Sequence, residues 1–218
     1  MIRALVLDFD GLMMDTESAL IQAYADVHAR HGVAFDRELF LRNVGQADYS
    51  FDPWLGFAKW ADRAALETER RARNKELDRE LPVLPGVAKL LAGARTASLQ
   101  LGMASNSSHP HVDGHLKRLG LFERFAWIAC REDVSSPKPE PDLYRLVLNR
   151  LGLASKEAVA FEDSNPGSLA AKRAGLWTVA VPGVSSLHQD FDHADLRLRS
   201  LAACDLPELI ARFEECAR

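Results

Sequence analysis

The sequence predicts an α/β fold built on a parallel sheet, with a small helical unit inserted into the chain. Short apolar runs alternate with amphipathic helical segments along most of the 218 residues. Several of these runs stop at polar clusters, and one long N-terminal interval holds no comparable run. Strands that alternate with helices in this way form βαβ units, whose crossovers make the strands parallel.

Five apolar runs are the expected strands, because short continuous apolar runs are typical of strands buried on both faces. They span residues 2–7, 99–104, 125–129, 158–161 and 177–181. The helical patterns span residues 86–94, 111–119, 142–151 and 168–174. Gly120, Gly152 and Gly175 follow three of these segments. A glycine at that place commonly closes the last helical turn in the left-handed conformation.

Residues 17–81 break this alternation and are predicted to form a helical domain of their own. The interval is far longer than the roughly 2 to 6 residues that usually join a strand to a helix. Residues 18–31 carry apolar side chains at helical spacing, and residues 63–80 are dense in Arg, Lys and Glu. That charged run favours a solvated helix face over a nucleic-acid patch. The core of the unit is expected to consist of Trp54, Phe57 and Trp60.

The composition is ordinary for a globular protein, with 47% apolar and 27% charged residues. The net charge of −4, from 27 basic and 31 acidic side chains, argues against a general nucleic-acid binder. No run approaches the roughly 20 apolar residues that span a bilayer. The three cysteines form no C-x-x-C pair and are expected to be reduced thiols. The first residues do not fit a secretory signal, so we expect a cytoplasmic protein.

Polar residues follow three of the expected strands, where the carboxyl ends of parallel strands converge on a crevice. They are Asp8 and Asp10, Ser105 and Asn106, and Glu162 and Asp163. Four carboxylates in one crevice repel one another unless a cation neutralises them, and Mg²⁺ prefers such oxygen ligands. A calcium loop starting at Asp8 would need a Glu at its twelfth position, which is Ala19. A simple Asx turn would explain Asp8 alone but not the three matching strand ends.

Four ordered motifs resemble those of the haloacid dehalogenase superfamily. They are Asp8-Phe9-Asp10-Gly11, Ser105-Asn106, Lys138 within Pro137-Lys138-Pro139, and Glu162-Asp163-Ser164. The resemblance covers essentially the whole chain. Residues 13–17 and the insertion after them look like the subfamily with a small helical cap, which includes sugar phosphatases and β-phosphoglucomutases. This implies a Rossmann-like core, residues 1–16 and 82–218, and a helical cap domain, residues 17–81, over the active site.

The resemblance also implies catalytic roles. Asp8 is the expected nucleophile, forming an aspartyl-phosphate. Asp10 is the expected general acid and base, a task that calls for a pKa raised by its setting. Ser105, through its hydroxyl, and Asn106, through its backbone, are expected to donate hydrogen bonds to the phosphoryl oxygens, while Lys138 neutralises their charge.

Mg²⁺ is the implied cofactor, held by Asp8, Asp163 and the backbone carbonyl of Asp10. Glu162 is either a further ligand, direct or through water, or a residue that orients the others. Substrate contacts are expected from Gly11, Glu17, Gln46, Ser105, Asn106 and Lys138. Specificity is expected to lie in cap positions near the cleft, such as Glu17, Asn43 and Gln46.

The predicted function is a Mg²⁺-dependent phosphatase acting on a small phosphomonoester. The alternative is a β-phosphoglucomutase-like isomerase, and a non-catalytic binding protein ranks last because every catalytic group is present. Mutases of this family usually carry a His four residues after the threonine that corresponds to Thr16, where this chain has Leu20. Their G-V-S-R motif is here Gly45-Gln46-Ala47-Asp48.

The expected partner is a small phosphorylated metabolite, with neither nucleic acid nor membrane involved, and the chain is expected to be a monomer or a weak homo-oligomer.

Three histidines form a further group in the sequence. His109, His111 and His115 lie close together in the sequence, but Pro110 separates the first two. We interpret them as a polar helix face rather than as metal ligands.

Overall fold

The computed structural model describes residues 1–46, 48 and 50–216. Its six-stranded sheet has the order β3-β2-β1-β4-β5-β6, and every neighbouring pair is parallel. The strands are β1 (Ala4–Leu7), β2 (Gln100–Ala104), β3 (Trp127–Ala129), β4 (Ala158–Glu162), β5 (Trp177–Ala180) and β6 (Leu196–Arg197). The parallel sheet predicted from the apolar runs is therefore confirmed.

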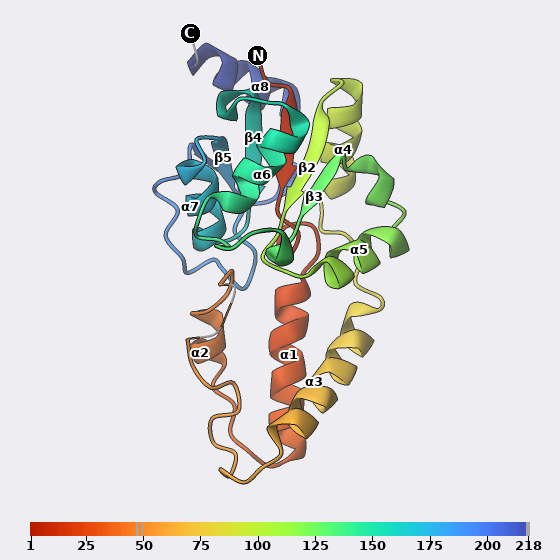
Figure 1. Cartoon of the computed structure of the whole chain (residues 1–218), viewed down its shortest axis with the longest axis vertical. Coiled ribbons are helices and arrows are strands. Elements are labelled where there is room, and N and C mark those ends of the chain that lie inside the picture. The colour runs from red at the N-terminus through yellow and green to blue at the C-terminus, as the bar shows by residue number, and fades with distance from the viewer. Residues whose placement is uncertain (47, 49, 217–218) are drawn as a thin grey trace.

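Helices cover both faces of this sheet and also extend beyond one end of it (Figure 1). They are α1 (Thr16–Arg30), α2 (Arg37–Leu41), α3 (Arg63–Asp78), α4 (Val87–Thr96), α5 (His109–Arg118), α6 (Asp142–Leu151), α7 (Asn165–Arg173) and α8 (Leu206–Cys216). Helices α4, α5 and α8 share one apolar cluster with the sheet, while α6 and α7 share a second. The sheet is thus the middle of three layers.

The side chains of β1 explain why the sheet must be covered on both sides. Leu5 and Leu7 belong to one apolar cluster, whereas Ala4 and Val6 belong to the other, and all four are fully buried. Successive residues of a strand point to opposite faces. A continuous apolar run is therefore buried on both faces, as expected for a central parallel strand.

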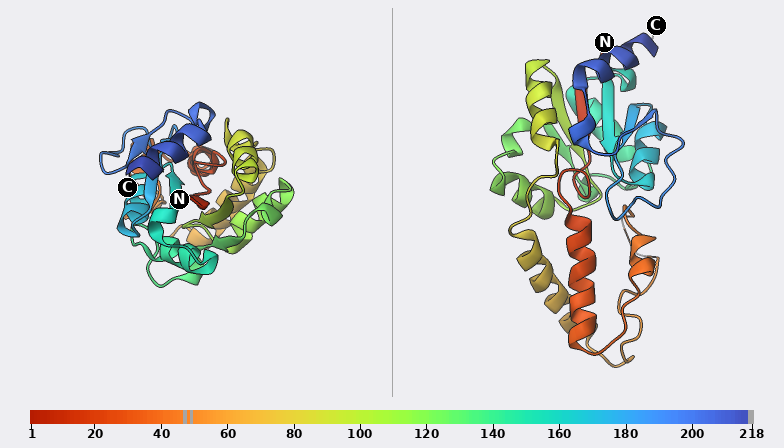
Figure 2. Two further views of the ribbon diagram at one scale, coloured as in Figure 1. Left: turned by 90° about the horizontal axis from the view of Figure 1, so that it is seen from above. Right: turned by 180° about the vertical axis from the view of Figure 1, so that it is seen from behind.

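Helices α1, α2 and α3 form the cap, which lies beyond the end of the sheet where β1 leads into α1 (Figures 1 and 2). Asp15 caps α1 by accepting a hydrogen bond from the backbone N–H of Ser18. Helices α1 and α3 pack against each other. Their shared core contains Tyr24 and Trp54. No strand lies in the described part of residues 17–81, in agreement with the predicted helical insertion.

The predicted core of the cap is only partly correct. Trp54 is buried and Phe57 packs against the same cluster, but the side chain of Trp60 is 90% exposed. Trp60 lies in the turn before α3, two residues before Asp62, which is the N-cap of that helix. Its spacing from Trp54 and Phe57 has no helical meaning there, because these residues lie in turns rather than on one helix.

Two α-helices, α2 and α8, and one strand, β6, were not predicted. Helix α2 has five residues and β6 has two, so neither is long enough for a periodic pattern. Helix α8 has eleven residues and does carry apolar side chains at helical spacing. No helix among the described residues is long and apolar enough to cross a bilayer.

The sheet order places its switch point at β1. This strand pairs with β2 on one side and with β4 on the other, so the chain leaves it in one direction and later returns on the opposite side. Ligands bind outside the carboxyl ends of the strands at such a point. The cap lies over the same end of the sheet (Figure 1).

Candidate active site

A cleft of about 280 Å³ lies at this switch point, between the strand ends and the cap. Its walls come from both parts of the chain and are mostly polar. Asp8, Asp10, Ser105, Asn106, Ser107, Lys138, Asp163 and Ser164 line it from the core, and Glu17, Leu20, Asn43, Gly45, Gln46 and Asp48 from the cap. Eight of the ten residues predicted from the sequence are in this lining. Gly11 and Glu162 lie directly behind it.

Asp8 is fixed at the end of β1 by both its backbone and its side chain. Its backbone N–H donates to the Phe161 carbonyl of β4, 3.0 Å away. Its Oδ1 accepts from Lys138 Nζ at 2.5 Å, and only 6% of the residue is exposed. Burial raises the pKa of Asp8 well above its usual range, although the Lys138 charge acts in the opposite direction. The carboxyl group is therefore held in one place at the floor of the cleft.

Lys138 joins the motifs of β1, β2 and β4. Besides Asp8, its Nζ donates to the Ala104 carbonyl at 2.7 Å and to Glu162 Oε1 at 2.6 Å. Although burial opposes its charge, the two carboxylates raise the pKa of Lys138 above its usual value. Tyr144 also donates a short hydrogen bond to Glu162 Oε1. The ammonium group is thus charged and buried, and its three hydrogen bonds fix its position.

Asp8, Glu162 and Asp163 form a carboxylate cluster that fits a divalent cation. One oxygen from each lies within 4.8 Å of the others, and Glu162 Oε2 has no hydrogen-bond partner among the described residues. Burial raises the pKa of Asp163 well above its usual range, and the Asp8 and Glu162 carboxylates raise it further. A cation with oxygen ligands would relieve the repulsion among these carboxylates.

Gly11 gives Asp163 the space it occupies. The residue has φ 76°, in the left-handed region, and a Cβ atom built there would lie 2.1 Å from Asp163 Oδ2. A side chain at this position would therefore displace the carboxylate as well as strain the turn. Gly11 contributes to the site through this close approach.

Asp10 has a different environment from Asp8. Its Oδ1 accepts hydrogen bonds from Thr16 Oγ1 at 2.6 Å and His111 Nε2 at 2.8 Å, and its Oδ2 accepts from Ser107 Oγ at 2.6 Å. Burial alone would raise the pKa of Asp10, but the His111 charge and these three hydrogen bonds lower it below its usual range. The expectation of a raised pKa is wrong for this conformation, because His111 stabilises the carboxylate.

The loop after β2 brings Ser105 and Asn106 into the cleft. Ser105 Oγ lies 3.5 Å from Asp10 Oδ2 and accepts from the backbone N–H of Ser107 at 3.0 Å. The Asn106 amide donates to the carbonyls of Gly45 at 3.2 Å and Lys138 at 3.1 Å. Its oxygen accepts from the Lys138 backbone N–H at 2.9 Å. The Asn106 side chain therefore ties the Lys138 loop and the cap loop to the strand end.

The cap wall contains fewer fixed side chains. Glu17 lies on the first turn of α1, where burial and the Asp10 charge raise its pKa to about 7. Gln46 is exposed. The Asn43 amide is used inside the cap, donating to the Leu39 carbonyl at 3.0 Å and accepting from Ser50 at 2.9 Å and 3.0 Å. Ala47, noted above for its departure from the mutase motif, lies outside the described residues.

Sequence reasoning assigned no role to several residues that contact the predicted groups, among them Ser107, His111 and Tyr144. Ser107 could have been found, since it directly follows Ser105-Asn106. His111 was interpreted as part of a polar helix face, and that interpretation is wrong: it lies on the first turns of α5 and reaches Asp10. Tyr144 lies in α6 and is fully buried. The apolar pattern of that helix predicts a buried ring at this position but does not indicate the role of its hydroxyl group.

The family model that describes haloacid dehalogenase-like hydrolases matches residues 5–181 of the chain. The match covers β1 to the end of β5 and all four motifs. The chain belongs to the haloacid dehalogenase-like hydrolases. The resemblance stated from the motifs is thereby confirmed, and the protein is an enzyme of the hydrolase class.

Relatives of similar length support this assignment. The chain is 36% identical to the Bacillus subtilis protein named "Putative phosphatase YhcW", over 96% of this chain and 97% of that one. It is 31% identical to hexitol phosphatase B of Escherichia coli, again over 96% and 97%. The crystal structure of CbbY from Rhodobacter sphaeroides in complex with phosphate superposes with a TM-score of 0.78 at 32% identity, covering 93% of this chain and 96% of that chain.

Proposed function

We propose that this haloacid dehalogenase-like hydrolase is a Mg²⁺-dependent phosphatase that cleaves a small phosphomonoester, such as a sugar phosphate, through an aspartyl-phosphate on Asp8. The observation that carries the proposal is the position of Asp8. Its carboxyl group lies at the floor of a polar cleft, between the Lys138 ammonium group at 2.5 Å and the Glu162–Asp163 pair. Nucleophile and counter-charges are therefore assembled before a substrate arrives.

Asp8 would attack phosphorus with its free carboxylate oxygen. Lys138 contacts Oδ1, so Oδ2 is the oxygen left to act as nucleophile. The attack forms a bond from this oxygen to phosphorus and breaks the bond to the substrate alkoxide. Lys138 would then balance the negative charge that Asp8 and the phosphoryl group share. Ser105 and Asn106, at the adjacent strand end, would donate hydrogen bonds to the phosphoryl oxygens.

Asp10 would move the two protons of the reaction. It would protonate the leaving alkoxide in the first step and accept a proton from the attacking water in the second. In the present conformation the carboxylate is stabilised by Thr16, Ser107 and His111, so Asp10 is ionised, as a base must be before it accepts a proton. The first step requires a higher pKa, which Asp10 would acquire when its carboxyl group turns away from His111 towards the substrate.

Mg²⁺ would be held by Asp8, Asp163 and the backbone carbonyl of Asp10, with Glu162 behind them. Its charge would stabilise the transferring phosphoryl group. The raised pKa values of Asp8 and Asp163 support this assignment, because both carboxyls need a cation to stay ionised in a buried cluster.

The cap wall supports a polyhydroxylated leaving group. Glu17 and Gln46 line the cleft opposite Asp8, and carboxylate and amide groups hydrogen-bond to hydroxyls. The volume of about 280 Å³ suits a small ligand. The cap, residues 17–81 in this proposal, would close to exclude bulk water and open to release the product.

A phosphate-release screen tests the proposal. Purified protein is assayed with sugar phosphates, hexitol phosphates, phosphoglycolate and nucleotides, with and without Mg²⁺. We expect steady release of inorganic phosphate from at least one small phosphomonoester and no release in excess chelator. Beryllium fluoride, which mimics a phosphoryl group, is expected on Asp8. Its attachment to any other side chain would contradict the mechanism.

One assay also addresses the mutase alternative. β-Glucose 1-phosphate is supplied with the bisphosphate primer, and both glucose 6-phosphate and inorganic phosphate are measured. We expect no appreciable glucose 6-phosphate, since Leu20 and Asp48 line the cap wall and neither can bind a second phosphate group. Efficient conversion with negligible phosphate release would replace the phosphatase assignment by the mutase.

A further inference from the structure

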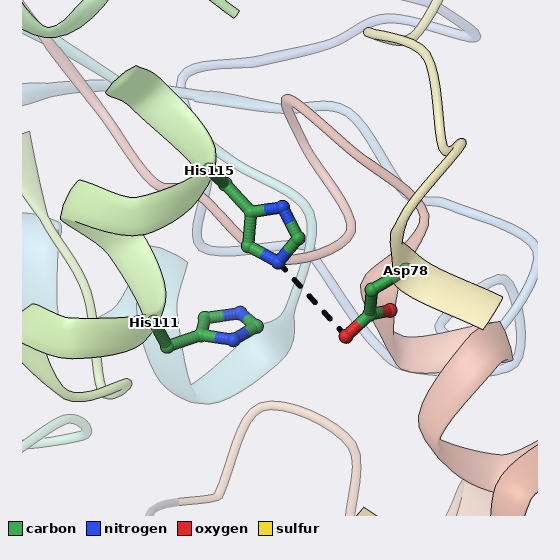
Figure 3. A group of neighbouring side chains, drawn as sticks. All are labelled: Asp78, His111 and His115. Atoms are coloured by element: carbon green, nitrogen blue, oxygen red, sulfur yellow. Dashed lines mark ion pairs between the residues drawn. The ribbon is translucent and has the colours of Figure 1, made fainter. Parts of the chain in front are cut away.

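A second cleft, of about 360 Å³, lies between the C-terminal half of α3 and one side of α5, from Pro110 to Arg118. Residues of both the cap and the core line this cleft, which lies beside the active site. Asp78, His111 and His115 line it, and Figure 3 shows their side chains converging from the two helices. Asp78 comes from the cap, while the two histidines come from one face of a core helix.

The spacing of these three groups is that of an incomplete metal site. One ligand atom from each residue lies within 4.8 Å of the others. His115 Nε2 is 3.9 Å from Asp78 Oδ2, which is too long for a hydrogen bond. Ligand atoms around a tetrahedral zinc ion lie about 3.4 Å apart, given metal–ligand distances of about 2.1 Å. A small inward shift would therefore bring the three ligand atoms to zinc-binding distances, with water as the fourth ligand.

The carboxyl group of Asp78 gives independent evidence for a ligand. The residue is 6% exposed, and its Oδ2 accepts from Asn74 Nδ2 at 2.6 Å. Its Oδ1 has no hydrogen-bond partner among the described residues, and neither has Asn74 Oδ1. Buried oxygens without a partner are costly in free energy. The oxygen that faces His115 is Oδ2, so a cation in the cluster would offset the cost at Oδ1 if it bound both carboxylate oxygens.

The imidazole rings are already oriented for metal binding. Both pack on the Phe9 ring, with centroid distances of 5.7 Å for His111 and 5.8 Å for His115. His111 Nε2 is paired with Asp10 Oδ1 at 2.8 Å, which leaves its Nδ1 for an ion. Metal-binding histidines typically hold a carboxylate with their second nitrogen in this way. Burial and the nearby charges of His111 and Arg118 lower the pKa of His115 to about 4, so its ring is neutral near pH 7. Despite burial, the Asp10 carboxylate raises the pKa of His111, so a bound ion would displace the proton from Nδ1 of that ring while Nε2–H keeps its bond to Asp10.

The surrounding charges decide which ion the site can hold. The basic side chains that line the cleft are Arg70, Arg71, Lys75, Arg79 and Arg118. Arg70 and Arg71 are paired with Glu67 at 2.6 Å and 2.9 Å. Arg118 donates to the Leu81 carbonyl at 2.9 Å. In this still cationic setting, a hard ion such as Mg²⁺ gains too little from one carboxylate. Two imidazoles instead favour a borderline transition ion, for which nitrogen ligands are suited.

We propose that Asp78, His111 and His115 form a binding site for a borderline divalent transition ion of the Zn²⁺ class. The site is separate from the carboxylate cluster of the active site and bridges cap helix α3 and core helix α5. A bound ion would link the two parts of the chain next to Asp10. This inference goes beyond the proposed phosphatase function and does not depend on it.

The test measures ion binding directly. Chelator-treated protein carrying Cys216→Ser, which removes the exposed thiol, is kept in excess Mg²⁺ to fill the oxygen cluster. It is then titrated with Co²⁺, followed by visible absorption, and with Zn²⁺ in competition. We expect one Co²⁺ per chain, with the intense absorption of a four-coordinate nitrogen-containing site, displaced by Zn²⁺.

Two conservative ligand variants and one matched control decide the outcome. His115→Gln and Asp78→Asn should each lower the Zn²⁺ affinity by at least about 100-fold, the upper end of the loss seen for mere outer-shell partners. His109→Gln is the control, because His109 lies on the same helix but pairs with Asp133 at 2.8 Å instead, and it should retain the wild-type affinity. Circular dichroism identifies any unfolded variant, and the other ligand variant then decides. Absence of Co²⁺ binding beyond the Mg²⁺ sites, or unchanged affinity in a folded ligand variant, would overturn the proposal.

Discussion

The two walls of the active-site cleft differ in how firmly their side chains are held. On the core wall, Asp8 and Lys138 are almost fully buried, as is Glu162 behind them, and Lys138 binds both carboxylates. On the cap wall, Gln46 is exposed and Glu17 is only partly buried. The core wall therefore has one arrangement that the fold enforces, while the cap wall can change without disturbing the sheet.

This difference separates chemistry from selectivity. A phosphoryl group is the same in every phosphomonoester, so the residues that would handle it can be rigid and deeply built into the core. The leaving group varies between substrates, and the side chains facing it lie on loops and a helix end that tolerate substitution. Substitutions on the core wall should accordingly lower turnover, whereas substitutions on the cap wall should alter the choice of substrate.

The largest effect is expected for Asp8→Asn. The substitution keeps the shape of the side chain but removes the anionic oxygen, so turnover should fall by at least about 1000-fold. Phosphate release under saturating substrate measures it. Asp15→Asn is the matched control: asparagine also serves as a helix N-cap, so the bond to Ser18 and the activity should persist. Near-wild-type turnover in Asp8→Asn would refute the nucleophile assignment.

Asp163→Asn should separate activity from stability. Loss of a proposed Mg²⁺ ligand should lower turnover by at least about 100-fold. In chelator, however, the variant should melt at a higher temperature than the wild type, because burial and neighbouring carboxylates destabilise the Asp163 charge. Phosphate release with Mg²⁺ and thermal melting without it are the two measurements. A variant less stable than the wild type in chelator would argue against mutual repulsion in the cluster.

The cap should show its own contrast between Trp54 and Trp60. Trp54 is 6% exposed and contacts Tyr24 and His28, with ring centroids 5.1 Å and 5.6 Å away. Trp54→Ala should lower the free energy of unfolding by about 3 kcal/mol. Trp60→Ala, at a residue 90% exposed, should change it by less than about 0.5 kcal/mol. Denaturant unfolding compares the two, and equal effects would contradict the described cap core.

A smaller, pH-dependent effect is expected for Glu17. Its pKa is raised to about 7 by burial and the Asp10 charge, so folding favours its protonated form. Wild-type stability should therefore fall relative to Glu17→Gln as the pH rises from about 5 to 8, by on the order of 2 kcal/mol. Unfolding free energies of both proteins in chelator test this. A constant difference over this pH range would mean that Glu17 ionises freely in the folded state.

The sequence was sufficient for strands β1 to β5, though not for the two-residue β6, because each central strand must be apolar on both faces. That requirement is visible in residues such as 4–7 without knowledge of their neighbours. The motif residues were also predictable, since parallel strands bring their carboxyl ends together. Lys138 illustrates the limit: its motif indicated a charge-neutralising role, but not that one ammonium group binds Asp8, Glu162 and a β2 carbonyl together.

What sequence reasoning could not supply depends on how separate helices meet. His111 reaches Asp10 only because α5 begins immediately after the β2 loop and directs its first turns at the cleft. The same histidine meets Asp78 only because α3 ends beside α5. No periodic sequence pattern indicates either contact. The residues that meet are too far apart in the sequence for helix or turn spacing to predict that they are neighbours.

The distribution of the four tryptophans divides the intrinsic fluorescence of the protein between its two parts. Trp54 and Trp60 are in the cap, one enclosed and one exposed. Trp127 and Trp177 are in the sheet, where Arg150 lies 4.3 Å and Lys156 3.9 Å from their ring centres. With Trp60 replaced by phenylalanine, Trp54 becomes the only tryptophan of the cap. Its wavelength would then follow the packing of the cap separately from the two cation-flanked indoles of the sheet.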